Sequence, residues 1–189
     1  VRVAGDADAA GRGVLVVMGD RVHSARDVRK AQTRAIEAFR GFPRESVAIV
    51  TPSRLDWFGA PWRVGDEARL EFLPLPEVPI LAVYAGMSAA AASRQLSDNP
   101  AGIVVSGLGE GNMPDPVRQV LLQHARRGAL VVRASRTDEG LVDREPQDEE
   151  NGFVAARALG VPKARVLLAL LIANGIAEPG EAQRYFDER

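Results

Sequence analysis

Lysine is scarce in this chain, and one lysine stands beside residues that could take part in proton transfer. Only Lys30 and Lys163 are lysines among the 24 basic residues. A desolvated lysine can lose its proton and serve as a base or a proton relay, whereas arginine cannot. If the segment HSARDVRK turns helically, Asp27 and Lys30 lie three residues apart on one face and can pair. The plainer interpretation is a solvated ion pair.

A second candidate site is the glycine-rich segment GLGEGN, residues 107–112. Glycines at alternate positions allow a tight turn and a close approach of the backbone to a ligand. The segment is not a dinucleotide-binding fingerprint, because Asn112 stands where the third glycine should be. It therefore indicates a ligand contact or, in the plainer interpretation, an ordinary turn from a strand to a helix.

An acidic segment, LVDREPQDEENG, occupies residues 141–152 and includes Glu145, Asp148, Glu149 and Glu150. A run of acids is most often a solvated loop. The alternative is that one acid is held beside a basic group of a substrate, where its charge strengthens the hydrogen bond.

Several other kinds of site find no support in the sequence. There is no cysteine, which excludes thiol nucleophiles, disulfides and thiolate metal sites. His23 and His124 lie far apart and no HxH or HxxxH motif occurs, so no histidine metal site is predicted. We expect His23 in a turn and His124 on the face of a helix. The GxSxG motif of serine hydrolases is also absent.

Apolar runs alternate with helical patterns, which is typical of a parallel sheet with crossover helices. Four runs are expected to be strands covered on both faces, at residues 14–18, 80–85, 102–107 and 129–135. Lys30 and the glycine-rich turn both come after predicted strands, and open α/β sheets place their sites at the carboxyl ends of strands.

Helices are predicted by apolar spacing and by proline and glycine at their ends. Residues 114–127 place Val117, Val120 and Leu121 on one face, with Gly128 just past the end. A further helix is expected to start within MSAAAAS, and others are expected from Pro162 to Asn174 and around Glu181 to Phe186.

The composition favours a globular protein of one or two domains. Its 189 residues are 46% apolar, which is enough for a sizeable core. The net charge of −1, with both signs scattered, predicts no nucleic-acid partner and no membrane-surface partner. The longest apolar run, residues 166–173, is far shorter than the ~20 residues that cross a bilayer. Prolines concentrated in residues 51–79 indicate a domain boundary.

The segment GVLVVMGDRVHSARDVRKAQT, residues 13–33, resembles the segment of bacterial-type L-asparaginases and glutaminases written GVLVVMND.I..ARDVTKTNT. AGIVVSGLGEGNMP resembles the GIV..G.GNGN turn of that family. RASRTDEG, NGFVAARAL and PKARVLLAL resemble later segments of the family in the same order. The resemblance covers essentially the whole chain.

This resemblance implies an α/β fold in which the end of an amino-terminal α/β domain precedes a flavodoxin-like carboxy-terminal domain with a parallel sheet. Residues 1–55 would be the remnant of the first domain, residues 56–76 the linker and residues 77–189 the second domain. Family members are homo-oligomers with sites shared between subunits, so the resemblance implies a dimer or tetramer.

The resemblance also implies roles for three residues. Lys30 matches the catalytic lysine of the family, which works with an aspartate and a threonine in a charge relay. Asn112 matches the asparagine after the glycine turn. Glu145, seven residues before Gly152, matches the acid that holds the α-ammonium group of the substrate. No metal or cofactor takes part in the chemistry of the family.

Two departures from the family pattern concern the site. The TGGTI motif with the nucleophilic threonine and the HGTDT motif are both absent from the 189 residues, in which Thr33, Thr51 and Thr137 are the threonines. Glu110 stands where the family commonly has the first asparagine of GNGN. The chain begins at Val1 rather than at a methionine, so a fragment or a processed form is expected.

The resemblance thus implies an L-asparaginase-type amidohydrolase that acts on L-asparagine, with L-glutamine as a further candidate. Its expected location is the cytoplasm, and a periplasmic or secreted protein is the alternative. If no preceding segment supplies the nucleophile, Ser24, Thr33 and Ser106 are the remaining hydroxyl candidates. The alternatives are a non-catalytic amino-acid-binding or assembly domain, which would need no lysine relay, and the asparaginase-like subunit of a transamidating complex.

Overall fold

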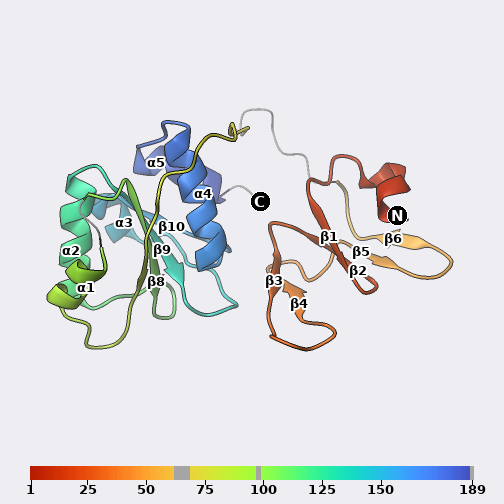
Figure 1. Ribbon diagram of the computed structural model, residues 1–189, viewed down its shortest axis with the longest axis horizontal. Helices are drawn as coiled ribbons and strands as arrows, with labels where there is room; N and C mark the ends of the chain where they lie inside the picture. The colour runs from red at the N-terminus through yellow and green to blue at the C-terminus, as the bar shows by residue number, and fades with distance from the viewer. Residues whose placement is uncertain (62–68, 97–98, 188–189) are drawn as a thin grey trace. The chain divides into compact units, whose positions relative to one another are not determined.

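The computed structural model describes residues 1–61, 69–96 and 99–187. The chain divides into two compact units, Val1–Ala68 and Arg69–Arg189, each of which is described by itself (Figure 1). The middle of the predicted linker, residues 62–68, lies outside the described residues.

The first unit is built from short antiparallel strands. Its main sheet has the order β1-β2-β5-β6, and β3 and β4 form a separate two-stranded sheet. Two 3₁₀ turns, η1 and η2, precede the first strand. The bounds are η1 Val3–Gly5, η2 Ala7–Ala9, β1 Leu15–Met18, β2 Arg21–Ser24, β3 Val28–Lys30, β4 Phe39–Gly41, β5 Ala48–Val50 and β6 Leu55–Trp57.

The prediction for residues 14–18 was right about the strand and wrong about its sheet. β1 pairs antiparallel with β2, and Met18 lies opposite Arg21. The reason is the connection, because only Gly19 and Asp20 separate the two strands, whereas a parallel crossover needs a dozen or more residues. β1 is also an edge strand that is not covered on both faces, since Val17 is 46% exposed.

The second unit confirms the predicted parallel sheet with crossover helices. Its four strands have the order β10-β9-β8-β7, and every neighbouring pair is parallel. The bounds are β7 Ile80–Ala82, α1 Ala89–Gln95, β8 Gly102–Gly107, α2 Asp115–Arg126, β9 Leu130–Ser135, α3 Pro146–Asn151, β10 Phe153–Ala155, α4 Val161–Ala173 and α5 Pro179–Asp187.

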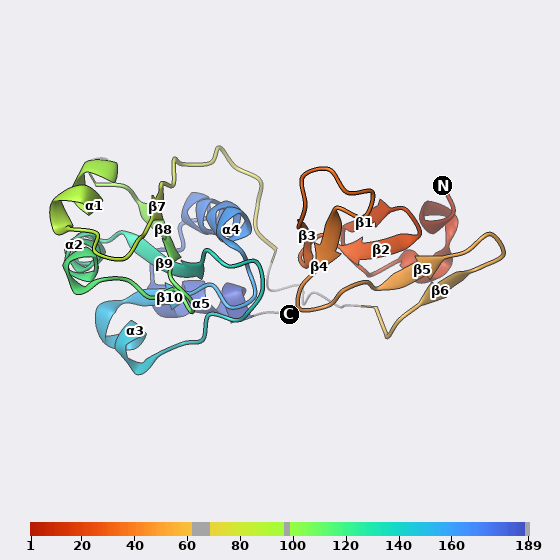
Figure 2. The same ribbon diagram turned by 90° about the horizontal axis from the view of Figure 1, so that it is seen from below.

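The sheet of the second unit has an apolar core on each face, because alternate residues of a strand point to opposite sides. Val104 and Val132 pack with residues of α4 and α5, whereas Val105 and Val131 pack with residues of α1 and α2. Figure 2 shows α1 and α2 on one side of the sheet and α4 on the other. The predicted inner face of residues 114–127 is confirmed, since Val117, Val120 and Leu121 of α2 are buried.

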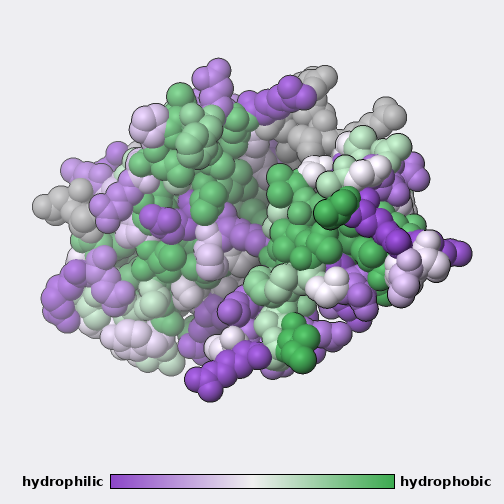
Figure 3. All heavy atoms as spheres, turned by 45° about the vertical axis from the view of Figure 1, so that its right-hand side comes forward, coloured by the Kyte–Doolittle hydropathy of each residue, from purple (hydrophilic) through white to green (hydrophobic). Residues whose placement is uncertain are grey.

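Hydrophobic side chains also reach the surface. On the face shown in Figure 3 they lie between charged and polar side chains. In the first unit, Val14 is 73% exposed and Met18 is 40% exposed. None of the helices in the described segments is long and apolar enough to cross a membrane.

A side chain of α5 forms hydrogen bonds with the outer edge of the edge strand β10. The Gln183 amide oxygen accepts the Ala155 N–H at 2.8 Å, and its Nε2 donates to the Ala155 carbonyl at 3.1 Å. Gln183 is 3% exposed, so these hydrogen bonds form away from water. The pair of bonds satisfies backbone groups of an edge strand and anchors α5 to the sheet.

Replacement of this amide should therefore destabilise the second unit. We expect Gln183→Ala to lower the free energy of unfolding by about 1–3 kcal/mol, because buried backbone groups of Ala155 lose their partners. Gln119 is exposed on α2, so Gln119→Ala is the matched control and should change stability by less than about 0.5 kcal/mol. Urea unfolding followed by circular dichroism measures both, and equal effects would contradict the anchoring role of Gln183.

Candidate functional site

The glycine-rich segment forms the predicted tight turn at the carboxyl end of β8. Leu108 and Asn112 exchange two backbone hydrogen bonds, with N···O distances of 2.8 and 2.7 Å. Gly109 and Gly111 adopt positive φ angles of 48° and 83°. Because the sheet is parallel, this turn lies at the same edge as the carboxyl ends of β9 and β10.

Gly107 is required by close packing within the turn. A Cβ atom at this position would lie 2.5 Å from the backbone carbon of Gly111 and 2.6 Å from its Cα. Gly111 in turn packs on Arg133, whose Cβ would be 3.3 Å from an added Cβ. The alternate glycines therefore let the turn fold back on itself and rest on β9.

Arg133 connects the segments at the carboxyl ends of the strands. It is fully buried in β9, with 0% exposure. Its Nε and Nη2 donate to the two carboxylate oxygens of Asp148, each at 2.6 Å. Nη2 also donates to the Asp143 carbonyl and Nη1 donates to the Glu110 carbonyl, both at 3.0 Å. One guanidinium thus binds the glycine turn and the acidic segment together.

The acidic segment is not the solvated loop that its composition favours. Residues 146–151 form the helix α3, and Asp148 is 1% exposed. The Oδ2 atom of Asp148 also accepts the backbone N–H of Glu145 at 2.9 Å, at the start of the helix. The loop expectation was wrong because the charge of Asp148 is paired with Arg133, which removes the need for solvent.

Asp143 fixes the preceding part of the acidic segment. Its carboxylate accepts a hydrogen bond from Arg157 and another from the Arg144 backbone N–H at 2.9 Å. The hydrogen bond from Arg157 is the main cause that lowers the pKa of Asp143, and the Arg144 N–H and the Arg157 charge add to it. The backbone of the segment is therefore held at Asp143 as well as at Asp148.

Glu145 and Asn112 lie in the two segments that Arg133 joins. The Glu145 carboxylate is 34% exposed, and its Oε1 lies 3.4 Å from Arg133 Nη1. Asn112 has an exposed side chain at the end of the turn, two residues after Glu110, whose carbonyl binds the same Nη1. The structure thus brings the segments of the two predicted substrate-binding residues onto one arginine.

Lys30 lies in the first unit and differs from the expectation in two ways. It is the last residue of β3, opposite Phe39 of β4, and its side chain is exposed. Asp27 is paired with Arg44 at 2.6 Å rather than with Lys30. The predicted pairing was wrong because the chain between them is extended, so residues three apart do not share a face as they do in a helix.

The two histidines lie in different units. His23 is not in a turn as expected but in β2, where it is 1% exposed and its Nδ1 contacts the Glu45 carbonyl. His124 lies on α2, as predicted. Within the described segments, no cluster of three or more histidine, aspartate or glutamate side chains could hold a metal ion.

Arg133 and Asp148 are the residues of this site that sequence reasoning missed. The available signal was a single arginine inside the apolar run ALVVRAS, where a charge must find a buried partner. The sequence does not show which of the acids in residues 141–152 that partner is.

Both units of the chain match known protein families. Residues 77–186 match the family described as Glutaminase/Asparaginase C-terminal domain, and residues 1–63 match the family described as Asparaginase, N-terminal. The chain belongs to the asparaginase family. The family resemblance predicted from the sequence is therefore confirmed, together with the α/β fold and its parallel carboxy-terminal sheet.

Individual relatives in the asparaginase family align with the whole of this chain. It is 34% identical to the probable L-asparaginase periplasmic of Haemophilus influenzae and 34% identical to L-asparaginase 2 of Escherichia coli. It is 31% identical to the glutaminase-asparaginase of Pseudomonas aeruginosa. The alignments cover 100% of this chain but 55%, 56% and 53% of those relatives, so the chain spans about half of their length.

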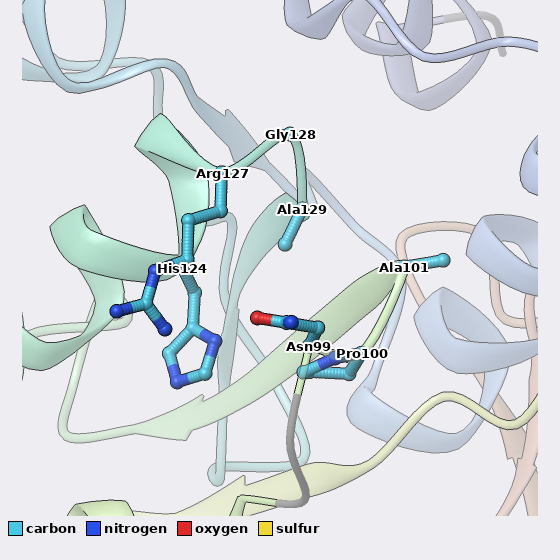
Figure 4. Close-up of a pocket in the computed structure, with 7 residues that line it drawn as sticks. All are labelled: Asn99, Pro100, Ala101, His124, Arg127, Gly128 and Ala129. Carbon is cyan, nitrogen blue, oxygen red and sulfur yellow. The ribbon is translucent and has the colours of Figure 1, made fainter.

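A small cavity lies at the amino-terminal ends of β8 and β9, opposite to the glycine-rich turn. It has a volume of about 100 Å³ and lies before β8 and after α2. Figure 4 shows the His124 ring facing the Asn99 side chain, with Arg127 beside the ring. Burial lowers the pKa of His124, and the positive charge of Arg127 lowers it further. This cavity is remote from Asn112 and Glu145 along the strands.

The glycine turn gives a test of close packing. Gly107→Ala should lower the free energy of unfolding by about 1–3 kcal/mol, because the added Cβ meets Gly111 backbone that cannot move aside. Gly180→Ala on α5 is the matched control, since nothing lies within 4 Å of its added Cβ. Urea unfolding should show a loss only for Gly107→Ala, and similar midpoints for the two variants would contradict the packing.

The lowered pKa of His124 predicts a pH dependence of stability. In the unfolded chain the pKa is about 6.5, so below that pH the unfolded state takes up a proton more readily than the folded state, and stability falls. His124→Gln removes this contribution. The urea midpoint should therefore fall less for the variant than for the wild type between about pH 7.5 and pH 5.5, and parallel curves would contradict the assignment.

Proposed function

We propose that this chain carries part of the active site of an L-asparaginase-type amidohydrolase, which converts L-asparagine to L-aspartate and ammonia, with L-glutamine as a further candidate. Lys30 is proposed as the proton relay, and Asn112 and Glu145 as residues that bind the amino-acid part of the substrate. The names of the relatives support the amidohydrolase class.

One observation carries the binding half of this proposal. Arg133 contacts the turn that ends at Asn112, and it lies 3.4 Å from Glu145, the residue that precedes α3. A carboxylate that is fixed in place can bind an ammonium group with little loss of conformational entropy, and the charge strengthens the hydrogen bond. Asn112 adds an amide that can donate to a carboxylate or accept from an ammonium group.

A catalytic role for Lys30 requires surroundings that exclude water and supply a carboxylate. A lysine relays a proton well only when it is desolvated and coupled to a carboxylate, and within the first unit the Lys30 side chain is exposed. We therefore propose that Lys30 is covered in the assembled enzyme, which we expect to be a homo-oligomer.

The proposed reaction follows an acyl-enzyme route. A hydroxyl oxygen attacks the side-chain amide carbon, the C–N bond breaks as the nitrogen takes a proton, and ammonia leaves; water then hydrolyses the ester to release L-aspartate. Because TGGTI and HGTDT do not occur in the 189 residues, we expect turnover from a protein that holds those motifs together with this chain.

A non-catalytic amino-acid-binding domain is the second candidate. It is favoured by the exposure of the Lys30 side chain within its own unit. Such a domain would bind L-aspartate and release no ammonia from L-asparagine.

Substitution of Glu145 tests the binding role. We expect Glu145→Gln to weaken L-aspartate binding by about ten- to a hundredfold, which corresponds to the loss of one charge-assisted hydrogen bond. Glu149→Gln is the matched control, because Glu149 is 65% exposed on the same helix. Isothermal titration calorimetry measures both, and unchanged affinity in Glu145→Gln would refute the assignment.

Substitution of Lys30 distinguishes the enzyme from the binding domain. Lys30→Arg keeps the charge and removes the relay, so it should lower the rate of ammonia release by about 10²–10⁴-fold while L-aspartate binding stays intact. Arg34→Met, at a neighbouring exposed position, is the control. Wild-type protein that binds L-aspartate without releasing ammonia, even with the missing motifs supplied, would favour the binding domain.

A further inference from the structure

We propose that Arg133 and Asp148 form a positioning pair that holds the Glu145 carboxylate beside the glycine turn and keeps its negative charge available for a substrate ammonium group. This inference rests on the proposed function, and it adds two residues that act through Glu145 rather than on the substrate.

The first argument is the number of groups that one guanidinium contacts. An arginine side chain carries five N–H donors in a fixed plane. Four of them bind the two Asp148 oxygens and the carbonyls of Asp143 and Glu110, at 2.6 to 3.0 Å. The remaining N–H group is on Nη1, which lies 3.4 Å from Glu145 Oε1. A lysine offers three donors from one nitrogen and cannot make this set of contacts.

The second argument concerns the sharing of Nη1. This nitrogen lies 3.0 Å from the Glu110 carbonyl and 3.4 Å from Glu145 Oε1. One atom of a buried side chain therefore contacts both the turn and the Glu145 carboxylate, which also takes part in the capping box with Asp148 at the start of α3. Since Arg133 is 0% exposed and Asp148 is 1% exposed, neither can change rotamer without burying an unpaired charge.

The third argument is the balance of charge. Asp148 holds the guanidinium through two bonds of 2.6 Å, whereas Glu145 is at 3.4 Å. Asp148 thus neutralises Arg133, and the three residues together keep one negative charge, which lies on the partly exposed Glu145. Without the Asp148 charge, the guanidinium would pair with Glu145 and compete with a substrate ammonium group for it.

The choice of variants must keep the fold intact. Arg133→Met alone leaves Asp148 buried and unpaired, which would be strongly destabilising. Asp148→Asn keeps the shape of the side chain and removes its charge, and Glu145 remains as a carboxylate that can pair with Arg133. The double variant Arg133→Met with Asp148→Leu replaces the whole pair by apolar side chains, which proteins often tolerate. Glu149→Gln is the matched control on the same helix, because that side chain is 65% exposed.

The binding experiment compares L-aspartate with succinate, which lacks the ammonium group, by isothermal titration calorimetry. We expect Asp148→Asn to lower the preference for L-aspartate over succinate by about tenfold, the loss of one charge-assisted contact, and Glu149→Gln to leave it unchanged. In the double variant Asp148→Asn with Glu145→Gln, the two losses should be less than additive, because both act on one carboxylate. An unchanged preference in Asp148→Asn, or full additivity, would overturn the proposal.

Hydrogen exchange gives a readout that does not depend on the proposed function. In Asp148→Asn, the displaced guanidinium releases the Glu110 carbonyl, so the Asn112 and Leu108 amides should exchange about tenfold faster, while amides within β8 and β9 keep their protection. The apolar double variant should show the same loosening. If the wild-type protein binds no L-aspartate, the proposed function fails, and the positioning role is then decided by exchange alone: unchanged Asn112 protection in both variants overturns it.

Discussion

The buried ion pair of Arg133 and Asp148 is the constraint on which the carboxyl edge of the second unit depends. A charge removed from water must be paired and hydrogen-bonded, or the fold loses several kcal/mol. Once Arg133 lies inside β9, the Glu110 carbonyl, the Asp143 carbonyl and the Asp148 carboxylate must come to it. The shape of the turn and the start of α3 follow from that requirement.

The two ends of the parallel sheet carry different chemistry. At the carboxyl ends, glycines and one arginine bring polar groups into fixed contact. At the amino ends, His124 faces a small cavity in which burial disfavours its charged form. Open α/β sheets gather ligand-binding groups at the carboxyl ends of strands, which agrees with the location of the candidate site in this member of the asparaginase family.

Local sequence patterns predicted most helices and strands of the second unit. They did not predict contacts between residues that are far apart in the sequence. The run GIVVSG became β8 and the helix at residues 114–127 became α2, because apolar period and end signals are properties of neighbouring residues. The sheet type of residues 14–18 was predicted wrongly, because a short apolar strand has the same composition in parallel and antiparallel sheets. The two-residue turn at Gly19 makes this pairing antiparallel. The pairing of Arg133 with Asp148, 15 positions away, produces no periodic pattern in the sequence that would predict it. The roles of Asn112, Glu145 and Lys30 come from the family resemblance and stay predictions.

The amide of Gln183 limits how this protein can associate. With one acceptor and one donor facing Ala155, it imitates the peptide group of a neighbouring strand. Incoming chains find the hydrogen-bonding positions of Ala155 already taken, so β10 offers no template there for continuous intermolecular sheets or for fibril growth. A side chain of α5 thus covers backbone groups of an edge strand that could otherwise pair with a strand of another chain.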